Sequence, residues 1–287
     1  MASAFFCISA IFLLFVLIHE VVLLEGSEDA AFSESYNISW GNGHVQSFFA
    51  GREIHLLMDK MSGSGFQSKL DYSSGLFHMD IKVPSRNSAG IVTAFYLKSS
   101  QSNGHDELDF EFLGNLEGKP IHLQTNIFVN GHGNREEKIR LWFDPSKNFH
   151  SYKILWNRYL TAFLVDEIPI RVFMNKGVAY PSKAMQVMGS LWNGEDWATN
   201  GGKDKINWMY APFTASFRTF SIDGCPAFEG GPQCYSSKYW WNGGGYAGLS
   251  PKQILAYRMI RKRHLVYDYC TDRRRYPVPP PECSQTV

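Results

Sequence analysis

Beyond residue 35 the chain consists of short runs in which apolar and polar residues alternate, separated by turn sequences. Turns such as Gly41-Asn42-Gly43 and Pro84-Ser85-Arg86-Asn87 recur at intervals typical of sandwiches and barrels, and not of parallel βα units. The strands that this pattern predicts are Gly75–Val83, Gly90–Leu97, Leu108–Leu113, Ile121–Val129, His150–Asn157, Leu160–Val165, Ile168–Phe173 and Phe213–Ile222. We therefore expect an all-β protein.

One short helix is predicted near the C-terminus. Ser250 fits an N-cap and Pro251 the first helical position, and apolar residues then recur at spacings of three and four up to about Arg263. The basic run Arg261-Lys262-Arg263-His264 would lie in the last turn, where the helix dipole favours positive charge. The alternative is that this basic run binds an acidic polymer.

The N-terminal segment carries a different pattern, because Ala4 to Ile18 is almost unbroken apolar sequence. This run is shorter than the about 20 residues of a membrane span, and it fits the apolar part of a secretory signal. We predict a signal peptide over residues 1–26 and a secreted mature chain, with an uncleaved anchor as the alternative. Secretion would make the single sequon, Asn37-Ile38-Ser39, a candidate glycosylation site.

Composition narrows the function further. The chain has 287 residues with 28 Lys and Arg against 27 Asp and Glu, so it lacks the basic field that follows nucleic-acid phosphates. Hydrophobic residues make up 44% of the chain, which argues against a disordered scaffold. Aromatic residues make up 15%, which suits a β protein that binds something flat.

The cysteines indicate an oxidising compartment. Loss of Cys7 with the signal leaves Cys225, Cys234, Cys270 and Cys283, an even set that allows three pairings. We favour the two local disulfides, Cys225–Cys234 and Cys270–Cys283, because each closes a short loop rich in Pro or Gly. The spacing lacks the close cysteine pair of a zinc site, and we expect no metal and no cofactor.

The candidate chemistry lies in one predicted strand. Glu107, Asp109 and Glu111 would share one face, because side chains alternate along a strand, while the apolar residues between them face a core. An edge strand with a charged solvent face is the alternative, but three acids without a basic residue would repel one another there. The outer Cα atoms would lie about 13 Å apart, which disfavours a shared metal.

Long side chains that lean toward Asp109 would bring the outer carboxyls to the about 5–5.5 Å separation of retaining glycosidases. Carboxyls this close cannot all ionise, so one should act as an acid while another stays ionised as a nucleophile. The strand therefore offers both groups that glycosidic bond cleavage requires.

The run HDELDFEFLG, residues 105–114, resembles the catalytic signature of the plant xyloglucan endotransglucosylase/hydrolases of glycoside hydrolase family 16. The resemblance extends over most of the chain. Further matching runs are Phe66-Gln67-Ser68-Lys69, Leu123-Gln124-Thr125-Asn126, Phe149–Trp156, Leu191–Gly202, Ala211–Phe220, Tyr269-Cys270 and Glu282-Cys283. The resemblance implies a concanavalin-like β-jelly-roll sandwich with a C-terminal extension. We expect a signal peptide over 1–26, a catalytic jelly roll over 27–225 and a disulfide-tied extension over 226–287 that packs on the same domain.

By resemblance, Glu107 would be the nucleophile, Glu111 the general acid/base and Asp109 the residue that orients Glu107. Residue alternation also places the amides of Gln124 and Asn126 on one face, where sugar hydroxyls need donors and acceptors. The residues that the resemblance places along the glucan are Gln124, Thr125, Asn126, Asn134, Arg135, Glu136, Trp192, Asp196, Trp197, Gly201 and Arg275.

The predicted function is secreted cleavage of the β-1,4-glucan backbone of xyloglucan and transfer of the cut chain to another xyloglucan in the apoplast and cell wall. We expect xyloglucan as donor and acceptor, no nucleic-acid or membrane partner after signal cleavage, and a monomer. The alternatives are a mainly hydrolytic endo-β-glucanase and a non-catalytic lectin-like module; binding alone would not need the acidic triplet. Many relatives carry a sequon after the catalytic strand, which Asn115-Leu116-Glu117 lacks.

Overall fold

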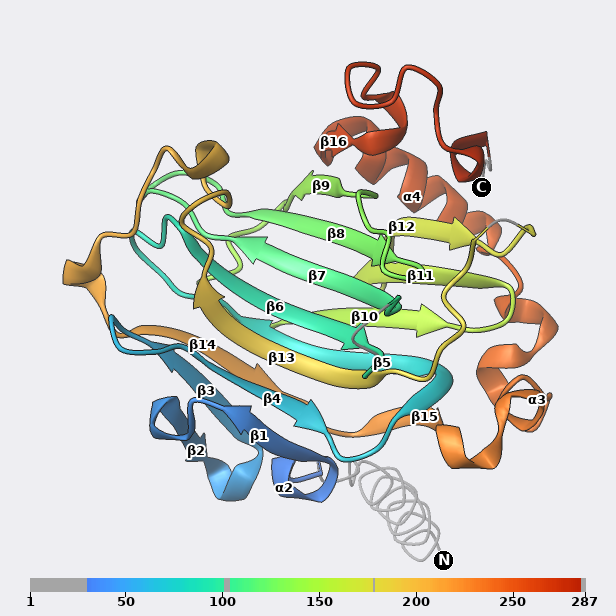
Figure 1. Cartoon of the computed structure of the whole chain (residues 1–287), viewed down its shortest axis with the longest axis horizontal. Helices are drawn as coiled ribbons and strands as arrows, with labels where there is room; N and C mark the ends of the chain where they lie inside the picture. Colours follow the sequence, from blue (N-terminus) through green and yellow to red (C-terminus); the bar gives the residue numbers. More distant parts are fainter. Residues whose placement is uncertain (1–29, 101–103, 178, 285–287) are drawn as a thin grey trace, which may run out of the picture.

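The computed structural model describes residues 30–100, 104–177 and 179–284, and the predicted signal peptide lies outside them. Two antiparallel sheets of eight strands lie face to face (Figure 1). The front sheet has the order β1-β4-β13-β6-β7-β8-β9-β16, and the back sheet has the order β12-β11-β10-β5-β14-β3-β2 with β15 paired to β5.

The strands are β1 (Tyr36–Trp40), β2 (Val45–Phe48), β3 (Glu53–Met58), β4 (Ser64–Ser68), β5 (Tyr72–Lys82), β6 (Ile91–Lys98), β7 (Glu107–Leu113), β8 (His122–Phe128), β9 (Glu137–Arg140), β10 (His150–Trp156), β11 (Leu160–Val165), β12 (Ile168–Met174), β13 (Gln186–Asn193), β14 (Phe213–Arg218), β15 (Ile222–Pro226) and β16 (Leu265–Asp268). The helices are α2 (Phe32–Ser35), α3 (Gly231–Cys234) and α4 (Pro251–His264).

The core between the sheets is rich in aromatic side chains. Phe110 of β7 packs edge-on against Phe163 of β11 with ring centroids 5.1 Å apart, and Phe112 packs edge-on against Tyr152 of β10 at 4.8 Å. Edge-to-face contacts of this kind add to the stabilisation from burying the rings. They fix the inward face of β7 and therefore direct its acidic residues outward.

The predicted strands agree with the structure except for the last one. The run Phe213–Ile222 is wrong as a single strand, because β14 ends at Arg218 and β15 begins at Ile222. Thr219 between them has a left-handed backbone with φ of 68°, which an extended strand cannot accommodate. Its hydroxyl donates to the Asp80 carboxylate at 2.9 Å and thereby holds the break.

The predicted helix is confirmed as α4, and it carries part of the C-terminal extension. The hydroxyl of Ser250 accepts from the backbone N–H of Gln253, whose side chain accepts from the N–H of Ser250, a capping box. After α4, β16 pairs with β9 and adds a strand to the front sheet (Figure 1). The proposed division at residues 225 and 226 falls inside β15.

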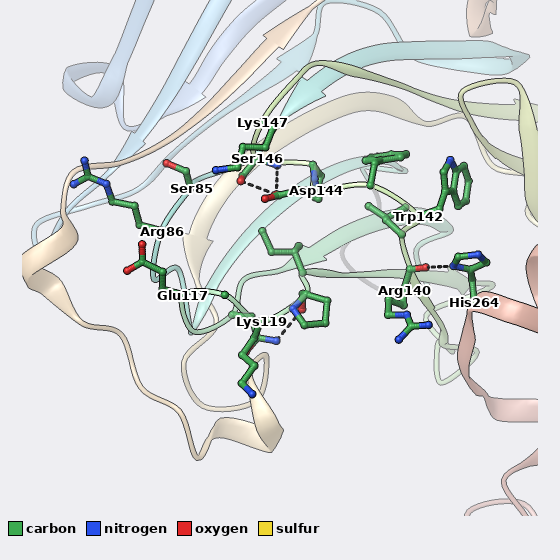
Figure 2. Close-up of a pocket in the computed structure, with 17 residues that line it drawn as sticks. Ser85, Arg86, Glu117, Lys119, Arg140, Trp142, Asp144, Ser146, Lys147 and His264 are labelled. Atoms are coloured by element: carbon green, nitrogen blue, oxygen red, sulfur yellow. Dashed lines mark hydrogen bonds between the residues drawn. The ribbon is translucent and has the colours of Figure 1, made fainter.

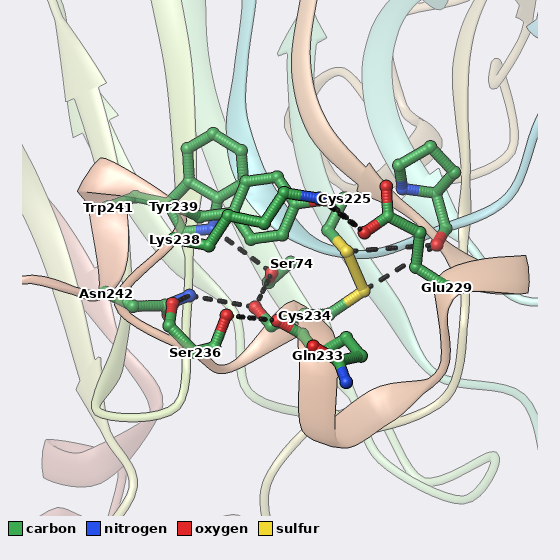
Figure 3. Close-up of a disulfide and its surroundings, with 11 residues drawn as sticks. Ser74, Cys225, Glu229, Gln233, Cys234, Ser236, Lys238, Tyr239, Trp241 and Asn242 are labelled. Atoms are coloured by element: carbon green, nitrogen blue, oxygen red, sulfur yellow. Dashed lines mark hydrogen bonds and ion pairs between the residues drawn. A yellow bond between two sulfur atoms is a disulfide. The ribbon is translucent and has the colours of Figure 1, made fainter.

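Both predicted disulfides are present in the structure, Cys225–Cys234 and Cys270–Cys283. Figure 3 shows the first of them, which joins β15 to α3 beside a buried hydrogen-bond network. The backbone carbonyl of Cys234 accepts from the hydroxyl of Ser74 at 2.7 Å and from the amide of Asn242 at 2.8 Å. The extension is therefore attached to the back sheet by covalent and polar contacts. In the described ranges, no helix is both long and apolar enough to cross a membrane.

Candidate active site

Strand β7 presents the acidic triplet on the outer face of the front sheet. Glu107, Asp109 and Glu111 line a cleft of about 260 Å³, whereas Leu108 and Phe110 between them are fully buried in the core. The preceding Asp106 is also buried, and its carboxylate accepts from backbone N–H groups of two other loops. The alternation predicted from the sequence is confirmed, and the strand is anchored at the end where the triplet begins.

Two basic side chains contact Glu107, and the sequence did not assign a role to either. Lys98 stands opposite Glu107 in the pairing of β6 with β7, and its Nζ lies 2.6 Å from Glu107 Oε2. The Nε2 atom of His105 lies 3.0 Å from the same oxygen. The two contacts fix the orientation of the Glu107 side chain on the outer face of the sheet.

Asp109 lies between the two glutamates and is buried. Burial raises the pKa of its carboxyl well above the usual range, and the charges of Glu107 and Glu111 raise it further. A hydrogen bond with Glu107 acts in the same direction on the pKa of Asp109. Asp109 is therefore suited to be a neutral donor to Glu107, because its own ionisation would add a third negative charge.

Glu111 has the environment of an acid. Burial raises the pKa of its carboxyl, a hydrogen bond from Gln124 opposes this, and the charge of Glu107 raises it again. The side-chain amide of Gln124 donates to Glu111 Oε2 at 2.9 Å. The triplet therefore combines a carboxylate held by Lys98 and His105 with a carboxyl, that of Glu111, which keeps its proton to a higher pH.

Replacing Gln124 with methionine should move the alkaline limb of the pH profile of kcat/KM to higher pH. The amide stabilises the ionised form of Glu111, so its loss raises the pKa of this carboxyl and preserves the acid form over a wider range. The measurement is kcat/KM for xyloglucan cleavage across pH.

Gln67 on β4 is a matched control, because Gln67→Met makes the same change at a half-buried position away from Glu111. The control should leave the limb where it is. If the alkaline limb of the pH profile does not move in Gln124→Met, a group other than Glu111 determines its position.

Strand β8 supplies two of the predicted sugar-contacting amides, and the third residue of the run faces the other way. Asn126 lies opposite Asp109 and Gln124 lies opposite Glu111. Thr125 is fully buried, and its hydroxyl accepts from Nη1 of Arg171 at 3.0 Å. The prediction of Thr125 as a substrate contact is wrong, because strand alternation directs its side chain into the core.

The loop after β8 joins with the extension. Nη1 of Arg275 lies 2.6 Å from the Glu136 carboxylate, and Nη2 donates to the side chain of Asn134. Sequence-distant residues thus come together beyond β8. The guanidinium of Arg135 instead pairs with Glu282 at 2.6 Å, so it attaches the extension and is not directed at a sugar.

The predicted aromatic residues lie on the other side of the triplet. Trp192 is on β13 and lines the triplet's cleft together with Trp40 of β1. Trp40 was not predicted as a site residue from the sequence, since only the sheet order brings the first strand near the triplet. The Trp192 and Trp197 ring centroids are 6.0 Å apart, and Trp197 is 38% exposed, which leaves it room to stack on a ring.

The remaining predicted residues lie beyond Trp197. Gly201 has φ of 65°, a left-handed backbone that favours glycine, and lines a neighbouring cleft of about 440 Å³ with His122 and Lys138. Asp196 is exposed, and its carboxylate pairs with Lys205 at 2.9 Å. Nowhere in the described part of the chain do three His, Cys, Asp or Glu side chains meet in a way that could hold a metal ion.

Comparison with known proteins gives matches along most of the chain. Residues 32–210 match the family model for glycosyl hydrolases family 16, and residues 235–283 match the model for the xyloglucan endo-transglycosylase C-terminus. Xyloglucan endotransglucosylase/hydrolase protein 3 of Arabidopsis thaliana is 55% identical over 257 residues, 88% of either chain. Protein 2 of the same plant is 50% identical over 284 residues, 97% of either chain.

Solved structures confirm the jelly-roll fold. The Bacillus licheniformis beta-glucanase matches with a TM-score of 0.53 and 22% identity, over 64% of this chain and 89% of that chain. The apo Crh5 transglycosylase matches with a TM-score of 0.56 and 21% identity, over 68% of this chain and 80% of that chain. At these identities the likeness concerns the fold alone.

Proposed function

The chain belongs to the xyloglucan endotransglucosylase/hydrolases of glycosyl hydrolases family 16, and from this we propose that it cuts the β-1,4-glucan backbone of xyloglucan and transfers the cut chain to a second xyloglucan. The observation that carries the proposal is the arrangement on β7, where Glu107 is held by Lys98 and His105 and Glu111 has a raised pKa. These are the two carboxyl groups that a retaining mechanism needs.

In the first step we assign attack at the anomeric carbon to the Glu107 carboxylate. A bond forms between Glu107 and that carbon as the glycosidic bond breaks, and Glu111 gives its proton to the departing sugar oxygen. Asp109, kept neutral by burial, donates to Glu107 and so orients it. As the new bond forms, negative charge leaves Glu107 and its contacts with Lys98 and His105 weaken.

In the second step Glu111, now ionised, takes the proton of an incoming hydroxyl while that oxygen displaces Glu107. Either water or a sugar can attack. A bound acceptor competes because a held near-attack pose gives effective concentrations of up to about 10⁵ M or more. The cleft at the triplet, which Trp40 and Trp192 also line, and the neighbouring cleft with Gly201 and His122 support such binding.

The same proposal includes secretion to the apoplast and cell wall with removal of residues 1–26. Asn37 is exposed on edge strand β1, so its side chain is accessible to a glycan. Substrate contacts are assigned to Gln124, Asn126, Trp192, Trp197, Gly201 and Arg275, with Asn134, Glu136 and Asp196 in supporting positions.

The test of transfer is to incubate xyloglucan with a fluorescent xyloglucan oligosaccharide and compare label entering polymer with reducing ends released. We expect label incorporation to exceed reducing-end release at saturating acceptor, and Glu107→Ala to show neither. If reducing ends dominate at saturating acceptor, the enzyme is mainly a hydrolytic endo-β-glucanase.

A further inference from the structure

A second cleft, of about 870 Å³, opens at the end of the front sheet near the start of β8 and the end of β9 (Figure 2). Four cationic side chains line it, those of Arg86, Lys119, Arg140 and Lys147. Figure 2 shows Arg86 and Lys119 on one side of it and Arg140 on the other. These residues come from three loops and a strand end, so only the fold brings them together.

The cationic side chains of this cleft outnumber its carboxylates, and within the described part of the chain none of the four is paired. In the residues that the structure describes, no hydrogen bond or ion pair engages the side chains of these four cations. Two carboxylates also line the cleft, those of Glu117 and Asp144, and Asp144 already accepts from the N–H and hydroxyl of Ser146. Positive charge that is held in a concave surface attracts anions more strongly than the same charge on a flat one.

Aromatic side chains also form part of the cleft wall. Trp142 and Phe143 lie in its wall, and the Trp142 ring is 5.8 Å from the ring of His264 at the end of α4. The residues of the basic run at that end therefore make different contacts. Arg261 turns inward to the Glu137 carboxylate, whereas His264 contributes to the cleft wall.

This cleft adjoins the cleft of about 440 Å³ that contains Gly201 and His122. The loop between β7 and β8 supplies Asn115, Lys119 and Pro120 both to this cleft and to the cleft that contains Gly201 and His122. An extended chain bound in one cleft can therefore reach the other. This adjacency favours a sugar polymer as the occupant over an isolated small anion.

We propose that this cationic cleft, formed by Arg86, Lys119, Arg140 and Lys147, binds an anionic polysaccharide whose uronate carboxylates pair with these side chains. The inference rests on the proposed function in that it takes the occupant to be a sugar polymer. Guanidinium and ammonium groups bind carboxylates by charge-assisted hydrogen bonds, and pyranose rings pack on aromatic faces. The site would hold the enzyme on acidic wall polymer while the triplet acts on neutral glucan.

The test measures binding of an α-1,4-galacturonate decamer by titration calorimetry at low ionic strength. The cleft variant is Arg86→Gln/Arg140→Gln/Lys147→Gln, and it should bind about tenfold more weakly than the wild type. The charge-matched control is Lys60→Gln/Lys176→Gln/Lys252→Gln, which removes three exposed lysines outside the cleft and should bind like the wild type. Salt should weaken wild-type binding, since exposed charges are screened.

Equal weakening in the two variants would overturn the proposal, because bulk charge would then explain the binding. Displacement of the decamer by inorganic sulfate at equal charge concentration would also overturn it, because the cleft would then be a simple anion site. The xyloglucan transfer assay with a neutral acceptor is run in parallel, and the cleft variant should keep wild-type activity in it. A wild-type enzyme that transfers xyloglucan without binding galacturonate overturns this inference alone. An enzyme without transfer overturns the proposed function instead.

Discussion

Replacing Glu107 with alanine is expected to lower kcat for xyloglucan cleavage by roughly 10⁴-fold or more while the protein stays folded. The side chain is the proposed nucleophile, and alanine leaves the anomeric carbon without an attacking group. The fold should survive because Glu107 belongs to the outer face of β7 and not to the core. Initial rates and a thermal unfolding curve of the same preparation provide the two measurements.

The matched variant is Glu111→Ala, which should also lose activity but differ in rescue by azide. In Glu107→Ala the small anion can take the place of the nucleophile and give a glycosyl azide of inverted configuration. In Glu111→Ala azide can replace the acceptor in the second step and give the retained configuration. Retained product from Glu107→Ala would reverse the two assignments, and wild-type turnover in that variant would remove the chemistry from this strand.

Replacing Glu137 with methionine is expected to cost about 3–5 kcal/mol in the free energy of unfolding. Its buried carboxylate pairs with Arg261 of α4 and lies 3.8 Å from Nε of Arg171 in β12. Methionine has a similar size but leaves the buried guanidinium of Arg171 without its counterion, and it leaves the half-buried Arg261 with Asp268 alone. Urea unfolding with the disulfides oxidised measures the loss.

An exposed acid provides the control for this experiment. The carboxylate of Glu167 pairs with Lys153 at the surface, where 70% of the Glu167 side chain is exposed. Glu167→Gln should therefore change the free energy of unfolding by no more than about 0.5 kcal/mol. A Glu137→Met protein as stable as this control would show that the buried pairs do not stabilise the contact between the extension and the sandwich.

Residue alternation allowed the long central strands to be predicted from sequence, but not the short or interrupted ones. Strand β2 has four residues, none of them buried, so it has no apolar face to detect. In β13 an inward position is occupied by Gly189, where a Cβ would lie 2.2 Å from the Phe66 ring. The packing that requires glycine removes the alternation by which the strand would have been recognised.

The candidate site was predictable where a single strand determines it. The common face of Glu107, Asp109 and Glu111 follows from the period of two alone. Lys98 and Trp40 reach the triplet through strand pairing and sheet order, which local sequence does not specify. Thr125 shows the opposite error, since alternation already directed it inward and the resemblance of the whole run outweighed that evidence.

The covalent role of Glu107 is central to the proposed mechanism, and trapping the glycosyl-enzyme tests it directly. An activated xyloglucan oligosaccharide with fluorine at carbon 2 of the reacting glucose slows both steps by destabilising their oxocarbenium-like transition states. After incubation without acceptor, digestion and tandem mass spectrometry locate the sugar on the peptide that contains both glutamates. We predict the glycosyl mass on Glu107 and its release as transfer product when neutral oligosaccharide is added. A sugar attached to Glu111, or an enzyme that turns over the natural substrate but never carries the label, would contradict the account.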